Sequence, residues 1–286
     1  MIELLDYILD ENNNFWIINN ISDKPKGYIV YKQNNNGNRY NNITKLLYEK
    51  TYNEPITYIP ENYKMIFKPQ KFYVENKNKL TGIWKKYINI LNEIEISDND
   101  IGVFGSYLIG FDIIKDVDFV IYGIDNLKKY YQYNDYIKNK LNANYISNDH
   151  VLEQYKKHKN RFPNECDLKE IISRNWSGIM LENNILSTPR FIDNNNYITP
   201  IKKGIDTKIQ VKVINGLQSA LLPRTAKVIY NNDEYTIISS IWKYQSFAHK
   251  NDELLIYANV DHNNKLIIID EDYYYIKYIK KGKNIN

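Results

Sequence analysis

Hydrophobic and polar residues along the first part of the chain recur with the spacing of both strands and helices. Residues 15–18 and 27–31 have the composition of two strands, and residues 64–67 form a third, shorter strand-like run. Residues 43–49 show helical spacing. Between positions 80 and 95 the apolar residues recur at intervals of three and four, which predicts an amphipathic helix.

The pattern then changes twice. In the middle of the chain it predicts strands and helices in turn: strands at 101–104 and 117–122, helices at 127–141, 151–159 and 167–176, and two strand segments within 179–191. From position 208 onward it is all-β, with expected strands at 209–213, 225–229, 235–238, 254–257 and 266–269. Five short strands in about 70 residues are typical of a small barrel or sandwich.

Together these patterns predict an α+β protein of three parts. We expect an N-terminal α/β region at 1–96, a core of mixed sheet and flanking helices at 97–200, and a C-terminal β-rich region at 201–286. An OB-like barrel that binds oligonucleotide is one interpretation of the C-terminal part. A small β module that only caps the rest is the other.

Length and composition fit a soluble protein. The chain has 286 residues, of which 43% are hydrophobic, enough for a sizeable core. The longest apolar runs, such as 266–269, are far shorter than a bilayer span, and residues 1–6 lack the basic start of a signal peptide. We therefore expect a cytoplasmic protein that does not associate with membranes.

The net charge and the cysteine content say little about the function of the protein. The net charge of +4 is compatible with a nucleotide or nucleic-acid partner but does not require one. The 27 tyrosines and the many lysines match the bias of an AT-rich genome, so we do not count them as evidence for a nucleic-acid surface. The single cysteine, Cys166, has acidic neighbours that would raise its pKa, which favours a structural thiol.

One segment, residues 101–123, combines residues suited to nucleotide chemistry. Gly105 allows a sharp turn from strand to helix without a Cβ to block a phosphate, and Ser106 opens the helix whose free N–H groups can hold phosphate oxygens. Asp116 and Asp118 alternate on the next strand, so their carboxylates share one face. Oxygen ligands of this kind favour Mg²⁺ or Mn²⁺ over zinc.

This order of a strand, Gly-Ser, a helix and Asp-x-Asp on the next strand resembles the signature of the DNA polymerase β-type nucleotidyltransferase superfamily. The wider chain is similar to uncharacterised archaeal predicted nucleotidyltransferases. The resemblance implies a nucleotidyltransferase-like sheet, with Asp116 and Asp118 as the catalytic and metal-binding residues and with Gly105 and Ser106 as residues that bind the phosphates of an NTP.

The sequence departs from that signature at one point. Active members of the superfamily place a third carboxylate on a later strand, where this chain offers Ser187 or Thr188. Glu182 and Asp193 are the nearest acidic residues. Either one of them completes the site, or the site has two carboxylates and catalysis depends on fewer metal ligands.

Two basic residues are further candidates for nucleotide binding. Lys115 precedes the carboxylate pair, and contact with a phosphate and a surface position are equally compatible with its place. Arg174 draws attention because arginine is scarce in this lysine-rich chain, and phosphate contact and a structural ion pair both remain open for it.

Two functions follow as hypotheses. The first is a metal-dependent nucleotidyltransferase that moves NMP from an NTP to a hydroxyl of RNA, protein or a small molecule. The second, motivated by the missing third carboxylate, is an inactive nucleotidyltransferase-like module that binds nucleotide, or binds RNA or DNA through its C-terminal region.

Overall fold

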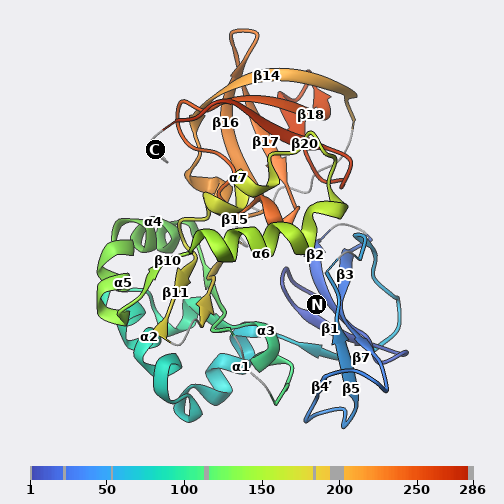
Figure 1. Ribbon diagram of the computed structural model, residues 1–286, viewed down its shortest axis with the longest axis vertical. Helices are drawn as coiled ribbons and strands as arrows, with labels where there is room; N and C mark the ends of the chain where they lie inside the picture. Colours follow the sequence, from blue (N-terminus) through green and yellow to red (C-terminus); the bar gives the residue numbers. More distant parts are fainter. Residues whose placement is uncertain are drawn as a thin grey trace. The chain divides into compact units, whose positions relative to one another are not determined.

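The computed structural model describes residues 2–21, 24–52, 54–112, 116–182, 185–193 and 203–282, and every structural statement below concerns these residues. They form a mixed α+β structure with several sheets (Figure 1). The chain divides into two compact units, the first made of Met1–Ile146 and Ser177–Ile192, the second of Ser147–Trp176 and Asp193–Asn286. This division differs from the three ranges expected from the sequence, because contacts join the first two ranges and assign the helices after position 146 to the C-terminal strands.

The first unit begins with an antiparallel sheet (Figure 1, blue). Its strand order is β4-β5-β3-β2-β1-β7, and β6 also pairs with β3. Aromatic side chains of this sheet meet Phe111, whose ring centroid lies 4.5 Å from that of Tyr31 and 5.5 Å from that of Tyr48. The strands are β1 (Tyr7–Asp10), β2 (Phe15–Asn20), β3 (Lys26–Gln33), β4 (Arg39–Tyr40), β5 (Leu47–Lys50), β6 (Thr57–Tyr58) and β7 (Tyr63–Phe67).

The prediction of a helix at 43–49 is wrong. The side chain of Asn41 accepts hydrogen bonds from the backbone N–H groups of Ile43 (3.0 Å) and Thr44 (2.9 Å), and Lys45 has a positive φ of 60°. These contacts make a tight turn, which competes with a helix, and the chain then enters β5.

The rest of the first unit surrounds a second sheet. In it β9 lies between β8, to which it is antiparallel, and β13, to which it is parallel. The strands expected at 101–104 and 117–122 and the helix expected at 80–95 are confirmed as β8, β9 and α2. The helix expected at 127–141 is interrupted at Tyr133 and forms two helices. These elements are α1 (Pro69–Asn76), α2 (Gly82–Glu93), β8 (Ile101–Val103), α3 (Gly105–Leu108), β9 (Phe119–Tyr122), α4 (Ile124–Gln132), α5 (Asn134–Leu141) and β13 (Arg190–Ile192), with the 3-10 turns η1 (Lys77–Lys79) and η2 (Asp98–Asp100).

A small antiparallel sheet of β10 (Asn144–Tyr145), β11 (Ile179–Met180) and β12 (Leu186–Ser187) completes this unit. The strand segments expected within 179–191 correspond to β11, β12 and the start of β13. Residues 186–192 run alongside residues 116–122. Asp116 bridges Leu186, and Val120 pairs with Arg190 in the same parallel register.

The second unit contains a closed β-barrel (Figure 1, orange and red). Within the described residues five strands form the ring β14-β16-β17-β19-β18, which closes because β14 also pairs with β18. The five strands expected from the sequence are all confirmed, whereas β20, which pairs with β18, was not expected. The strands are β14 (Ile205–Asn215), β16 (Arg224–Tyr230), β17 (Asp233–Ser239), β18 (Glu253–Asp261), β19 (Leu266–Ile268) and β20 (Tyr275–Lys280), with β15 (Leu221–Leu222) and the 3-10 turns η6 (Leu217–Ala220) and η7 (Trp242–Tyr244) between them.

Two helices belong to the same unit. The expected helices at 151–159 and 167–176 are found as α6 (Asn148–His158) and α7 (Leu168–Ser173), and η3 (Lys159–Arg161) follows α6. Ser147 caps α6, because its side chain accepts a hydrogen bond from the His150 N–H at 3.2 Å. In the part of the chain that is described, no helix combines the length and the apolar character needed to cross a membrane.

Candidate functional site

The Gly105–Ser106 turn lies directly against Asp118. The N–H of Phe104 donates to the Asp118 carbonyl at 2.9 Å, which ties the end of β8 to the strand that carries the carboxylates. Gly105 has a φ of +74°, and a Cβ at this position would lie 2.6 Å from Asp118 Oδ2. Glycine is therefore required for conformation and for space. Gly105 is the first residue of α3, and Ser106, which follows it, is half-buried.

Asp116 and Asp118 present their carboxylates on one face of an extended segment. The segment continues the parallel register with the chain that leads into β13, since Asp116 bridges Leu186 and the Val117 N–H donates to the Leu186 carbonyl at 2.9 Å. Val117 and Phe119 are buried on the opposite face. The alternation expected from the sequence is thus present, and the Asp118 carboxylate lies beside the glycine turn.

The electrostatics of Asp118 are unusual for a carboxyl group. Burial, and after it the neighbouring carboxylate of Asp116, raise the pKa of Asp118 to about 7. The positive charges of Arg190 and Lys50, and a hydrogen bond from the backbone N–H of Thr188, act in the opposite direction. Two carboxylates held this close favour a proton or a cation between or beside them.

No third carboxylate occupies the matching positions of the neighbouring strand. In the parallel register Leu186 lies beside Asp116 and Thr188 beside Asp118, and Arg190 pairs with Val120. Within the described ranges, no three His, Cys, Asp or Glu side chains come together as a metal-binding group.

Two further acidic residues were candidates for a third carboxylate. Glu182 is exposed, and its carboxylate accepts a hydrogen bond from the side chain of Asn142 at 3.3 Å. Asp193 is buried and belongs to the second unit. Lys115 lies outside the described residues, so its expected contact with a phosphate stays a prediction.

Two cations and a tyrosine from the N-terminal sheet belong to the surroundings of the carboxylate pair. Lys50 acts on the charge of Asp118, and Tyr31 experiences the charges of both aspartates. The Arg39 guanidinium donates to the Tyr31 hydroxyl at 3.1 Å. The sequence interpretation missed these residues, although the scarcity of arginine (five in the chain) is a signal that applies to Arg39 as well.

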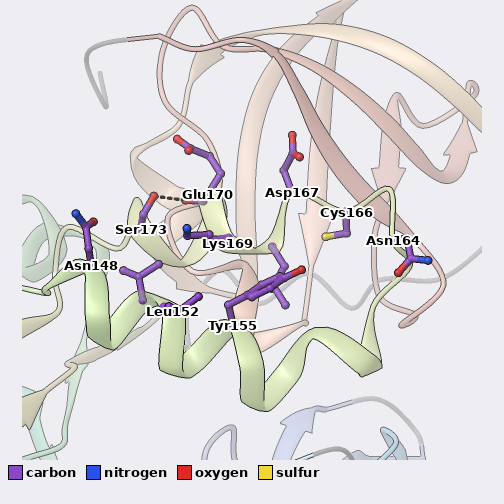
Figure 2. Close-up of a pocket in the computed structure, with 11 residues that line it drawn as sticks. Asn148, Leu152, Tyr155, Asn164, Cys166, Asp167, Lys169, Glu170 and Ser173 are labelled. Carbon is purple, nitrogen blue, oxygen red and sulfur yellow. Dashed lines mark hydrogen bonds between the residues drawn. The ribbon is translucent and has the colours of Figure 1, made fainter.

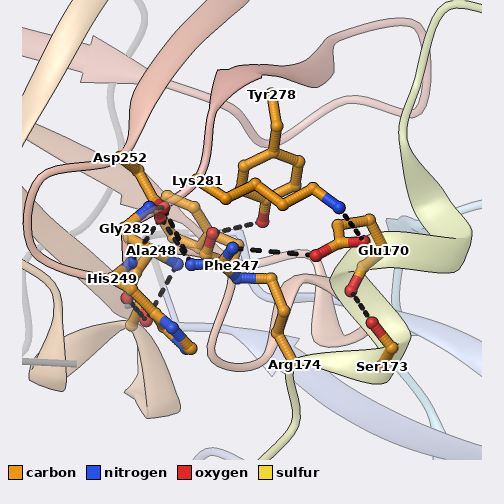
Figure 3. Close-up of polar contacts among 11 residues, drawn as sticks. Glu170, Ser173, Arg174, Phe247, Ala248, His249, Asp252, Tyr278, Lys281 and Gly282 are labelled. Atoms are coloured by element: carbon orange, nitrogen blue, oxygen red, sulfur yellow. Dashed lines mark hydrogen bonds and ion pairs between the residues drawn. The ribbon is translucent and has the colours of Figure 1, made fainter. Parts of the chain in front are cut away.

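Arg174 lies in the second unit and makes a structural ion pair (Figure 3). Its Nη2 contacts both carboxylate oxygens of Asp252, at 2.9 and 2.8 Å, and its guanidinium covers the ring of Tyr278 at 4.7 Å. Asp252 also accepts the backbone N–H groups of His249 (2.6 Å) and Gly282 (2.7 Å). Of the two roles left open for Arg174, the structure shows the ion pair.

A hollow of about 640 Å³ lies between α6 and α7 in the second unit (Figure 2). Its polar groups serve local structure: the Asp167 carboxylate accepts the Tyr278 N–H at 2.7 Å, and the Ser173 hydroxyl donates to the Glu170 carbonyl at 2.7 Å. Cys166 contacts the hydroxyl of buried Tyr244 at 3.6 Å, and burial raises the pKa of its thiol. Cys166 is therefore a structural thiol, and the hollow brings together no set of groups that indicates a particular chemistry.

Comparisons with models of protein families, with curated proteins and with solved structures find no match to this chain.

Proposed function

We propose that this protein is a metal-dependent nucleotidyltransferase, which moves NMP from an NTP to a hydroxyl of RNA, a protein or a small molecule in the cytoplasm. The observation that carries the proposal is the contact between the glycine turn and Asp118, the second member of the carboxylate pair. A Cβ on Gly105 would lie only 2.6 Å from Asp118 Oδ2, so a backbone that can approach a phosphate lies beside a carboxylate that can hold its counterion.

The donor set fits Mg²⁺ or Mn²⁺. Mg²⁺ in nucleotide enzymes is held by one or two carboxylates, and substrate phosphates and water complete its six ligands. Asp116 and Asp118 supply two carboxylates. Burial, and after it the charge of Asp116, raise the pKa of Asp118, and a bound cation relieves both effects. When bound, the ion would neutralise and align the phosphates of the NTP.

The residues of the chain would act around that ion. Asp116 and Asp118 would hold it. The backbone N–H groups at Gly105 and Ser106, with the Ser106 hydroxyl, would hold oxygens of the phosphate chain. Arg190 would offset the charge of the carboxylates from the neighbouring strand, where it pairs with Val120.

The fold supports the same proposal at a coarser level. Strand β8, the short helix α3 that begins at Gly105, and the strand segment that carries the aspartates and continues into β9 follow one another in the order of the superfamily's signature. Strand β13, later in the chain, lies parallel to β9. In the barrel the strands follow the order first, second, third, fifth, fourth, with the third and fifth parallel, so we propose that it is OB-like.

A transfer assay tests the proposed activity. Wild type and the double variant Asp116→Asn/Asp118→Asn are incubated with each α-labelled NTP, Mg²⁺ or Mn²⁺, and RNA, protein and small-molecule acceptors. We expect labelled product with wild type and a loss on the order of a thousandfold or more in the variant. Unchanged thermal unfolding of the variant would show that the fold is intact. Transfer that survives both substitutions would disprove the mechanism.

A second candidate function is a nucleotide-binding module without transferase activity. The observation that favours it is Arg190, a fixed cation on the strand where the resemblance requires a third carboxylate. If wild type transfers no label but an NTP raises its melting temperature only when Mg²⁺ is present, this second candidate is the correct one.

The barrel is the proposed contact for RNA or DNA. At one end of it, half-buried Tyr230 stacks on exposed His262 with ring centroids 6.1 Å apart, and Lys265 lies 5.0 Å from the ring of Tyr235. Stacking surfaces beside basic groups bind single strands without sequence preference. We expect Tyr230→Ala to weaken binding of a labelled oligonucleotide in an anisotropy titration, and equal binding by the variant would exclude this surface.

A further inference from the structure

One face of the N-terminal sheet carries two basic side chains on neighbouring strands. Tyr31 of β3 is paired in register with Lys50 of β5, and Tyr48, two residues before Lys50, is paired with Arg39 of β4. Residues paired in register point to the same side of a sheet, and so do residues two apart. Arg39, Tyr31, Tyr48 and Lys50 therefore share one face.

That face continues into the segment that follows the Gly105–Ser106 turn. Asn41 forms a bridge with Phe111, and its side-chain amide donates to the Ile109 carbonyl at 2.6 Å. Phe111 in turn donates its N–H to the Ser106 carbonyl at 3.0 Å. A chain of backbone and side-chain hydrogen bonds thus fixes Arg39, two residues before Asn41, relative to the turn proposed to hold phosphate.

The Arg39 and Lys50 side chains contact aromatic rings. The Arg39 guanidinium lies 5.5 Å from the ring centroid of Tyr31 and 6.0 Å from that of Phe111. The Lys50 ammonium lies 5.7 Å from the ring of Tyr52. Among the described residues neither cation makes an ion pair, although both are only partly exposed. Stacking on rings orients a cation and leaves its N–H donors available to an anion.

The negative charge of an NTP requires cations in the binding site. The two negative charges of Asp116 and Asp118 balance the two positive charges of one Mg²⁺, so the carboxylate–metal unit is close to neutral. A triphosphate brings several negative charges, which this unit alone does not offset. The charge of Lys50 acts on Asp118, and Tyr31, whose hydroxyl accepts a hydrogen bond from Arg39, experiences the charges of both aspartates. Arg39 and Lys50 are therefore cations near the carboxylates that can compensate the phosphates.

We propose that Arg39 and Lys50 of the N-terminal sheet bind the triphosphate of the nucleotide, so that this sheet forms one wall of the nucleotide site and selects NTP over NMP. The inference rests on the proposed function, because it takes the carboxylate pair and the glycine turn as the other wall. Arg39 supplies a planar fork for two phosphate oxygens, and Lys50 supplies a point charge. Tyr31 positions Arg39 through the hydrogen bond to its hydroxyl.

Isothermal titration of the full-length protein with ATP, ADP and AMP in the presence of Mg²⁺ tests this inference. In wild type we expect affinity to rise with each added phosphate. Lys50→Gln and Arg39→Gln should each weaken ATP binding about tenfold and leave AMP binding unchanged. Arg39→Lys, which keeps the charge and loses the fork, should fall between wild type and Arg39→Gln.

Lys32→Gln is the matched control. Lys32 is adjacent to Tyr31 on the same strand, its side chain points to the other face of the sheet, and it pairs with Glu54. The control removes the same charge, so it should bind ATP like wild type. Inorganic tripolyphosphate should displace ATP, and an oligonucleotide with a free 5′-hydroxyl should not. Displacement by that oligonucleotide would mean that the cations bind a nucleic-acid backbone and would overturn the inference.

The two possible failures are distinguishable. If wild type binds ATP with Mg²⁺ but Lys50→Gln and Arg39→Gln bind it equally well, the inference is wrong and the proposed function stands. If wild type binds none of the four NTPs, both are wrong. Melting temperatures within a few degrees of wild type would show that a loss of binding in the variants is not a loss of folding.

Discussion

Position 105 imposes two independent requirements on its residue. The backbone has a φ of +74°, which residues with a Cβ rarely adopt, and the space where a Cβ would stand is taken by the Asp118 carboxylate at 2.6 Å. Gly82, by contrast, meets only the first requirement. The second ties the turn to the carboxylate and makes position 105 a test of the site as well as of the fold.

We predict that Gly105→Ala lowers the free energy of unfolding by about 2–4 kcal/mol, because strain in the backbone adds to the clash with Asp118. Gly82→Ala is the control: Gly82 has a φ of +56°, but nothing lies within 4 Å of the added Cβ. It should cost only about 1–2 kcal/mol. Urea unfolding of the two variants measures the difference, and equal costs would show that Asp118 does not lie against position 105.

His249 provides a prediction for pH. Burial, and next the charge of Arg174, lower the pKa of His249 from 6.5 to about 4. Its Nε2 is buried and has no hydrogen-bond partner among the residues that the structure describes. A group whose pKa is lower in the folded state binds protons more readily when unfolded, so its stabilising contribution is complete above pH 6.5 and is lost as the pH falls towards 4.

We therefore expect that lowering the pH from 7 to 5 reduces the free energy of unfolding of wild type, relative to that of His249→Gln, by about 1–2 kcal/mol. Comparing the two proteins at each pH cancels the other titrating groups, including Asp6, whose pKa burial raises to about 7. Thermal unfolding across this range is the measurement. A difference that stays constant with pH would contradict the burial of the imidazole.

The residues of the candidate site were predictable to different degrees. Asp116 and Asp118 could be recognised because alternation on a strand is a local property, and Gly105 because a glycine ends the preceding strand. Lys50 could not be placed near them, and arginine scarcity alone did not place Arg39 there, because the pairing of β3, β4 and β5 links positions far apart in the sequence. In a lysine-rich chain, composition also gives no reason to single out Lys50.

At the scale of single elements, the pair Arg174 and Asp252 joins helix α7 to the start of β18. The side chain of Asp252 is completely buried and that of Arg174 nearly so. Lys281 makes a second ion pair with the same helix, through Glu170 at 2.7 Å, but its side chain is 57% exposed. Substitutions in the two ion pairs therefore allow a buried and an exposed interaction of the same helix to be compared.

Arg174→Met should destabilise the protein by about 3 kcal/mol, because it leaves the Asp252 carboxylate buried without its cation. Lys281→Met should cost less than about 1 kcal/mol, because solvent screens the exposed pair. Denaturant unfolding of both variants tests this order. If both substitutions have the same small effect, the Asp252 carboxylate is not dependent on Arg174.

Elements with a strong local pattern were predicted well, and elements decided by side-chain contacts were not. The barrel strands alternate cleanly because one face of each lines the core. At 43–49 the helical spacing of apolar residues was misleading, since hydrogen bonds from the backbone to the Asn41 side chain fix a turn there. Strand β4 has only two residues, and β20 lies in a tyrosine-rich run with little alternation.

At the scale of the whole molecule, the order of the segments along the chain did not reveal how they group. Residues 147–176 lie between two segments of the first unit in the sequence, yet they pack with the C-terminal barrel. The grouping depends on long-range contacts such as the hydrogen bond from the Asp167 N–H to the Ile276 carbonyl at 2.9 Å. No period or composition shift in the sequence marks such a contact.

The central claim is that Asp116 and Asp118 share an ion beside the glycine turn. A crystal structure of the protein with Mg²⁺ and a non-hydrolysable NTP tests it directly. The account predicts an ion at about 2.1 Å from oxygens of both carboxylates, with phosphate oxygens at the N–H groups of Gly105 and Ser106. A nucleotide bound elsewhere, or carboxylates that contact Arg190 and Lys50 and leave the ion out, would contradict it.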